Sequence, residues 1–211
     1  MPLTVGCPRC AAPVAPTEAG YVCVEHGEIT PLWRPRTVAY EDFAEHLQTT
    51  PGCPTYLPWP LSPGWSIADF AGVAAPGAPA RATMTCTSGT SALDGPVDVI
   101  VVAEEPGTGL GSRLAGLDAP DPGADVGVGP ALVRVRIDRQ VVPLWSVSVS
   151  DTAGEWDRSV LAGEAAGRWL WLIVRPASAM LLLRDDWILR DASGDGPHLV
   201  ELPFGGPAPT W

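Results

Sequence analysis

Hydrophobic and polar residues alternate along several short segments of the chain. In residues 132–137, valine and isoleucine alternate with two arginines, which gives a strand one dry face and one solvated face. Residues 141–147 follow after three polar residues, so these two segments predict a β-hairpin. Residues 65–74 and 81–87 flank a turn that contains two prolines and a glycine, and they predict a second hairpin.

Other segments are continuously apolar rather than alternating. Residues 97–103 form such a run, which is typical of a central strand that is buried on both faces. Residues 169–174 and 180–183, separated by a short turn around Pro176, predict a third hairpin. Residues 157–167 are compatible with a helix or a strand, although two glycines weaken the helix. Short edge strands are predicted at residues 187–190 and 199–202, and further strands up to about residue 33.

Helical patterns are few and short. Residues 37–50 predict a helix in which Thr37 is the N-cap and the apolar side chains lie near one face. Residues 110–117 predict a second, shorter helix after a glycine-rich loop. Residues 51–64 contain many prolines, which exclude a helix or a central strand and predict an extended connector.

Together these elements predict an α+β protein with two parts. Residues 1–36 are predicted to form a small N-terminal domain, and residues 37–211 an α+β domain that is mainly antiparallel sheet with one to three short helices. In this second part, residues 65–211 form the sheet body. The 23 glycines and 24 prolines agree with many turns and few long helices.

Four potential metal ligands near the N-terminus have a characteristic spacing. Cys7, Cys10, Cys23 and His26 form the pattern C-x2-C-x12-C-x2-H, in which each short-spaced pair makes a tight turn and the intervening residues form a hairpin. Residues 1–36 resemble the zinc-ribbon family and are predicted to form a small zinc ribbon, with His26 where the fourth cysteine usually stands. Four protein donors leave no open coordination position, so the predicted zinc is structural. The alternative is a set of reduced thiols without metal.

Composition and charge exclude several functions. The chain has 211 residues, and all 13 basic residues are arginine. Because there is no lysine, a Schiff-base enzyme, a pyridoxal phosphate enzyme and a Walker-type phosphate loop are excluded. The net charge of −11 argues against nucleic acid as the main partner, and residues 1–36 carry equal numbers of arginine and glutamate. Nine tryptophans indicate that some lie at an edge or an interface, and the surplus is one of the features that favour a protein partner.

Targeting signals are not evident in the sequence. The N-terminal residues lack a basic start and an apolar run, so no signal peptide is expected. The most apolar stretch is interrupted at Arg175 and Pro176, and no membrane span is predicted. We therefore expect a cytoplasmic protein.

One glycine-rich loop is a candidate for ligand binding. It begins at Glu104 and ends at Arg113, and it follows the predicted central strand. Backbone N–H groups of glycines and a helix N-terminus can hold an anion, although two glutamates at the loop entrance oppose a phosphate. The candidate ligand-binding residues are Gly107, Gly109, Gly111, Ser112 and Arg113.

Catalytic side chains are otherwise scarce. The acidic loop at residues 118–125 lacks the spacing of a calcium-binding loop and indicates a solvated surface. Cys53, in the proline-rich segment, is a candidate reactive thiol. Neither His46 nor His198 stands in a recognisable arrangement with a nucleophile, and there is no Gly-x-Ser-x-Gly sequence. The residues therefore favour a protein that is not an enzyme, and no catalytic residue is predicted.

The order of motifs resembles an actinobacterial family of unknown function with an N-terminal zinc ribbon. Besides the ribbon, the motifs that carry this resemblance are LPWPL at 57–61, PGW at 63–65, VAEEPG at 102–107, GLG at 109–111, DAPDPG at 118–123, AGEA at 162–165 and WLW at 169–171. Automated labels sometimes describe its members as phosphotransacetylase-like, but these residues contain no acyl-phosphate site. The resemblance implies no activity, substrate or catalytic residue.

Two functional hypotheses follow from the sequence. The first is a non-enzymatic zinc-ribbon protein that binds another protein as a regulatory or assembly factor. The second is an enzyme that binds a small molecule or nucleotide phosphate through the loop from Glu104 to Arg113.

Overall fold

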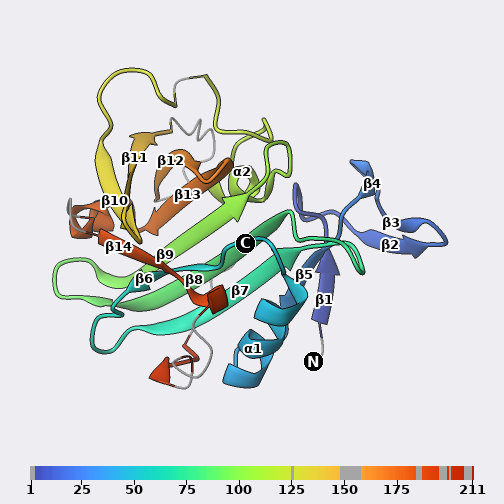
Figure 1. Cartoon of the computed structure of the whole chain (residues 1–211), viewed down its shortest axis with the longest axis horizontal. Coiled ribbons are helices and arrows are strands. Elements are labelled where there is room, and N and C mark those ends of the chain that lie inside the picture. The colour runs from blue at the N-terminus through green and yellow to red at the C-terminus, as the bar shows by residue number, and fades with distance from the viewer. Residues whose placement is uncertain are drawn as a thin grey trace.

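The chain folds into one large curled β-sheet, a small separate sheet and a few short helices, as the computed structural model shows (Figure 1). The structure describes residues 3–124, 126–147, 158–183, 187–194, 199, 201–206 and 211. The strands are β1 (Leu3–Gly6), β2 (Val14–Thr17), β3 (Gly20–Cys23), β4 (Gly27–Ile29), β5 (Leu32–Pro35), β6 (Tyr56–Trp59), β7 (Ser66–Val73), β8 (Ala82–Ser91), β9 (Gly95–Glu104), β10 (Val133–Ile137), β11 (Gln140–Ser146), β12 (Ser159–Ala165), β13 (Arg168–Arg175) and β14 (Trp187–Asp191). The α-helices are α1 (Tyr40–Thr49) and α2 (Leu110–Ala115), and the 3-10 helices are η1 (Ala177–Leu182) and η2 (Ala192–Gly194).

The main sheet has eleven strands in the order β1-β5-β7-β8-β9-β13-β12-β11-β10-β14-β6. All pairs are antiparallel except β10 with β14. The sheet curls so that β6, at one end of this order, packs over β8 and β9 near its middle. The Thr85 hydroxyl on β8 donates to the Tyr56 carbonyl on β6 at 2.6 Å, so polar side chains also tie the two layers together.

Apolar side chains fill both faces of this curled sheet. One cluster lies inside the curl, between the middle strands and the layer formed by β6, β10 and β14. A second cluster lies on the opposite face and includes side chains of α2, and a third lies beneath α1. Most residues of β8, β9 and β13 are buried on both faces, which explains why the segment at 97–103 is continuously apolar.

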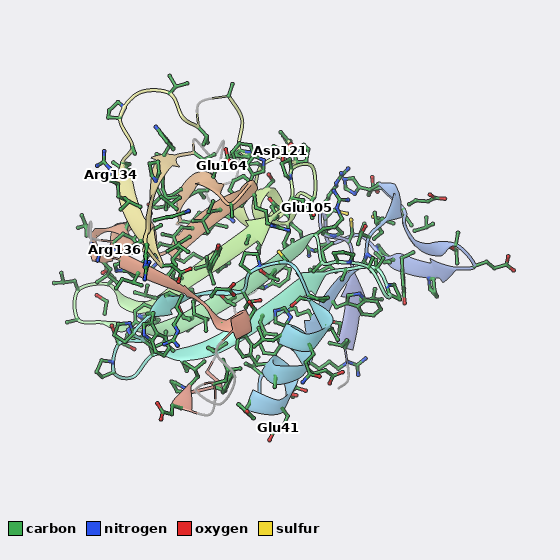
Figure 2. The ribbon with its side chains drawn as sticks, in the orientation of Figure 1. Glu41, Glu105, Asp121, Arg134, Arg136 and Glu164 are labelled. Carbon is green, nitrogen blue, oxygen red and sulfur yellow. The ribbon has the colours of Figure 1, made fainter. Side chains whose placement is uncertain are left out.

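Three of the predicted strand arrangements are confirmed. β7 pairs with β8, and β10 pairs with β11, as the two alternating segments predict. β9 lies between β8 and β13 in the middle of the sheet. On β10 the apolar residues are buried, whereas Arg134 and Arg136 are exposed (Figure 2), because side chains alternate between the two faces of a strand.

The third predicted hairpin is wrong. Residues 180–183 form no strand, and most of them belong to the 3-10 helix η1. β13 pairs instead with β12, which is thus a strand rather than a helix. The turn between these two strands is Ala166-Gly167, with φ of 52° and 76°. Positive φ at both central residues gives the tight hairpin turn that matches strand twist, so the preceding segment pairs with β13.

Smaller corrections concern the ends of elements. The helix predicted at residues 37–50 is α1, but its N-cap is Ala39 rather than Thr37. The proline-rich connector contains β6, which ends the strand order and pairs with β14 alone, as expected of a proline-containing edge strand. The predicted strand at 187–190 is β14. The one predicted at 199–202 is absent from the described residues of that segment, namely 199, 201 and 202.

The segment with the four potential ligands leaves the main sheet and returns to it. β1 pairs with β5, and β5 with β7, so both strands that flank this segment belong to the main sheet. Between them, β2, β3 and β4 form a separate three-stranded antiparallel sheet, which projects from the end of the main sheet (Figure 1). We call residues 7–29 the finger. The division of the chain at residue 36 stays a prediction.

In the part of the chain that the structure describes, the helices are too short or too polar to cross a bilayer.

Candidate metal centre

The finger brings its four potential ligands to one point. Cys7 and Cys10 follow β1, Cys23 is the last residue of β3, and His26 immediately precedes β4. The Cys10 Sγ lies 3.3 Å from the His26 Nδ1 and 3.5 Å from the Cys23 Sγ. The His26 Nδ1 also lies 3.6 Å from the Cys7 Sγ and 3.7 Å from the Cys23 Sγ. All four ligand atoms lie within 4.8 Å of one another.

These distances fit a tetrahedral site. Bonds of about 2.3 Å to sulfur and about 2.0 Å to nitrogen imply S–S edges of about 3.8 Å and S–N edges of about 3.5 Å. The four edges given above run from 3.3 to 3.7 Å, and the two remaining edges are no longer than 4.8 Å. Cys7 and Cys23 are buried, and His26 is exposed. The four side chains could therefore hold a metal ion, as the spacing predicts.

Local backbone geometry supports this arrangement. The backbone N–H of Arg9 donates to the Cys7 Sγ at 3.4 Å, a contact that stabilises a thiolate. Gly27, directly after His26, has φ of 65°, the left-handed conformation that glycine adopts without strain.

Two arginines fasten the base of the finger to the predicted glycine-rich loop. The Arg113 guanidinium donates to the Cys7 carbonyl at 2.6 Å. In the other direction, the Arg9 guanidinium donates to the carbonyls of Gly107 at 2.6 Å and Thr108 at 3.4 Å. A Cβ atom at Gly109 would lie 2.9 Å from the Arg9 Cγ, so glycine at this position leaves room for the arginine stem.

A buried carboxylate organises the same loop from inside. Glu104, the last residue of β9, is fully buried, and it accepts hydrogen bonds from the backbone N–H groups of Leu110 at 2.8 Å and Gly111 at 3.2 Å. The Trp171 indole N–H donates to the same carboxylate at 2.7 Å. Burial raises the pKa of Glu104 to about 7, against the lowering effect of these N–H donors. A Cβ atom at Gly111 would lie 2.2 Å from the Trp171 Nε1, so glycine at this position leaves room for the indole ring.

The structure thus places the five candidate ligand-binding residues beside the finger. Gly107 donates its N–H to the Asp121 carboxylate at 2.8 Å, Ser112 is buried in α2, and Arg113 contacts Cys7. Figure 2 labels Glu105 and Asp121, which lie at the end of the sheet near the finger. The backbone donors of Gly107, Leu110 and Gly111 are engaged within the chain, so a phosphate would have to displace carboxylates. Anion binding here stays a prediction.

Trp211 is a neighbour of the metal centre that sequence reasoning missed. The guanidinium groups of Arg34 and Arg113 lie 4.3 and 5.1 Å from the centre of its ring, distances that permit cation–π attraction. Its indole N–H donates to the Asp69 carboxylate at 2.9 Å, and Arg34 forms a 2.6 Å ion pair with that carboxylate. The surplus of tryptophans was the signal available, but nothing in the local sequence links residue 211 to residue 34.

The remaining candidates lie apart from this centre. Cys53 is buried, and burial raises the pKa of its thiol to about 11, so the thiol stays protonated at neutral pH. Its sulfur contacts Thr83 and Ala103, whereas the His46 Nε2 lies 3.5 Å from the Thr55 hydroxyl. Asp125 and His198 lie outside the described residues.

Comparison with known proteins leads to one family. A family model matches residues 1–211, the full length of the sequence. No curated protein and no solved structure matches the chain. The family's description names no source, metal or activity, so the actinobacterial origin and the zinc stay predictions. On this full-length match, the chain belongs to the family of unknown function DUF6758.

Proposed function

We propose that the chain holds one structural zinc ion in its finger and acts as a non-enzymatic factor that binds another protein. The arrangement of Cys7, Cys10, Cys23 and His26 carries this proposal. Three thiols and one imidazole are donors that suit zinc.

A structural role follows from the number of donors. Four protein ligands complete a tetrahedral shell and leave no position for water or substrate. The finger also buries few of its own side chains, so metal binding would supply much of the free energy that orders it. The carbonyl of Cys7 and the side chain of Arg9 are used to join the finger to the body, which supports a fixed platform.

The surface of the finger favours a protein partner. Glu18, Glu25 and Glu28 are exposed, and residues 14–29 contain no arginine. The one arginine of the finger, Arg9, is bound to the Gly107 and Thr108 carbonyls, so this surface offers few cations to neutralise phosphates. Val24 keeps 70% of its surface exposed, which offers an apolar contact between the carboxylates. A neutral or basic protein surface would complement this finger.

Elemental analysis tests the metal. We expect about one zinc per purified chain and a loss of zinc in Cys7→Ser. A matched control is Cys86→Ala, which removes a buried thiol of β8 outside the finger and should retain the metal. A folded, reduced protein without zinc would contradict the proposal.

Affinity capture from the native cell, followed by chemical cross-linking, tests the partner. We expect the wild-type chain and Cys86→Ala to be cross-linked to the same protein through the finger. Cys7→Ser and Val24→Asp should lose these cross-links. Recovery of the same proteins by all four chains, or cross-links confined to the sheet body, would contradict the interaction role while leaving the zinc site intact.

A further inference from the structure

A cavity of about 550 Å³ lies on the side of the main sheet covered by the C-terminal end of α1. Its walls come from the helix end, from β5 and β7, and from the turn between β7 and β8. The volume falls in the range of about 300–1,000 Å³ that small-molecule sites occupy. The metal ligands are not among its lining residues, so it is a separate feature of the molecule.

The lining is apolar and carries no formal charge. Leu3, Trp33 and Phe70 provide large apolar surfaces, and Pro76 and Pro79 lie in the turn. Among the lining residues that the structure describes, there is no aspartate, glutamate or arginine. In a chain with 37 charged side chains, this composition is selective against ions, because a charged ligand would lose its hydration without gaining a partner.

Three polar residues at the end of α1, namely His46, Thr49 and Thr50, line one side of the cavity. The His46 ring stacks on Phe43, with ring centres 5.9 Å apart and planes at 22°, and it lies 5.2 Å from the Phe70 ring. Burial lowers the pKa of His46 to about 4, so the imidazole is neutral at pH 7. The Thr50 hydroxyl donates to the His46 carbonyl at 2.8 Å, and the Thr49 hydroxyl is shared between the carbonyls of Glu45 at 3.0 Å and His46 at 3.1 Å. Both hydroxyl oxygens remain available as acceptors.

Close packing of β7 against the end of α1 fixes the positions of His46 and Thr50. A Cβ atom at Gly72 would lie 2.5 Å from the Thr50 Cγ2 and 3.4 Å from the His46 Cε1. The absence of a side chain at Gly72 therefore lets the strand approach the helix end. The Thr55 hydroxyl lies 3.5 Å from the adjacent ring atom, the His46 Nε2.

We propose that this cavity is a binding site for a small, uncharged and mainly apolar organic molecule that carries at least one hydrogen-bonding group. The apolar body of the ligand would lie against Trp33 and Phe70, and its polar group would face the threonine hydroxyls and the imidazole of His46. This site goes beyond the proposed function and does not depend on the zinc.

Fluorescent dyes of different charge test the site. The uncharged dye 1-aminoanthracene is titrated into the full-length, metal-loaded chain, and the anionic dye 1-anilinonaphthalene-8-sulfonate serves as the charged comparison. We expect saturable binding of the neutral dye with a Kd below about 50 µM and binding of the anion that is at least about tenfold weaker. No saturable binding of the neutral dye, or equal affinity for both dyes, would overturn the proposal.

A pair of matched variants locates the binding. Ala78→Trp places a large side chain at the exposed turn that borders the cavity, whereas Ala92→Trp places the same side chain in an exposed turn elsewhere. We expect the first to weaken binding of the neutral dye at least about tenfold and the second to leave it unchanged. Gln48→Trp, at the exposed helix side of the same cavity, is the substitute if Ala78→Trp does not fold. Equal affinity in the cavity and control variants would overturn the proposal.

Discussion

The finger and the sheet body are ordered by different forces within one chain. In the finger, Cys7, Pro8 and Cys23 are buried, and most other side chains are exposed. In the body, most residues of β9 and β13 are buried. Burial of apolar surface stabilises the body. The finger is too small for a core: two arginine side chains join it to the body, and the proposed metal would supply the rest of its stability.

The two regions meet at the loop between β9 and α2. Glu104 holds this loop from the body side, and Arg9 and Arg113 join it to the finger. Glycines in a strand-loop-helix arrangement can thus form a contact surface for another part of the same chain. A glycine allows close approach of another group, and at Gly109 that group is the side chain of Arg9.

Removal of the metal should disrupt the finger while sparing the body, and this is the largest expected effect. Structural zinc supplies apparent binding free energies of about 10–16 kcal/mol in small domains. We expect Cys23→Ser, or a strong chelator, to make residues 7–29 susceptible to protease while the thermal transition of the body persists. Limited proteolysis with mass spectrometry measures this, with Cys86→Ala as the control. Equal protection of the finger with and without metal would show that metal binding does not order it.

Removal of a buried side chain from the sheet should destabilise the body. Trp171 is fully buried and contacts Glu104, so we expect Trp171→Ala to lower the free energy of unfolding by about 3–5 kcal/mol. Trp187→Ala, at a partly exposed tryptophan of β14, should cost less. Denaturant unfolding followed by circular dichroism compares the two. Similar losses in both variants would show that burial does not decide the stability of the body.

Glu104 should make the stability of this junction depend on pH. Burial raises its pKa from 4.5 to about 7, so between these values the folded state holds a proton that the unfolded state has lost. The stability that this group contributes is therefore complete below about pH 4.5 and falls as pH rises to 7, by about 1–3 kcal/mol.

Glu104→Gln removes this titration, although it also disturbs the hydrogen bonds to Leu110 and Gly111. We expect the free energy of unfolding of the wild type to exceed that of Glu104→Gln by more at pH 5 than at pH 8. Urea unfolding of both proteins at the two pH values measures this difference. A difference that does not change with pH would show that Glu104 ionises normally.

The smallest effect is expected at the anchor on the finger side. Arg9→Ala removes hydrogen bonds to the Gly107 and Thr108 carbonyls, and because Arg9 is exposed we expect a loss of about 0.5–1.5 kcal/mol in local stability. Hydrogen exchange of the finger amides measures it. Arg139→Ala, at an exposed arginine of the turn between β10 and β11, is the control. Identical exchange in both variants would show that the arginine does not anchor the finger.

Local signals account for what could be predicted. The spacing of Cys7, Cys10, Cys23 and His26 predicts their convergence, because two tight turns and one hairpin bring them together. Alternation predicts the pairing of β7 with β8 and of β10 with β11. The Ala166-Gly167 turn was a local signal for pairing β12 with β13, and it was missed because the longer apolar pattern favoured residues 180–183.

Contacts between distant segments could not be predicted from local sequence patterns. The carboxylate of Glu104 meets Trp171 only because β9 and β13 are neighbours in the sheet. The cavity near His46 draws its walls from β5, α1 and β7, and no short pattern relates them. Trp211 contacts Arg34 and Arg113, which lie 177 and 98 residues before it in the chain.

By itself, therefore, the sequence determined the ligand set of the finger, the antiparallel character of the body and the absence of lysine chemistry. Spacing, alternation and composition act over a few residues, and their physical causes are equally local. The tertiary structure alone decided that the glycine-rich loop receives the finger and that a neutral cavity forms beside α1. Both features depend on which strands become neighbours, which is set by burial over the whole sheet.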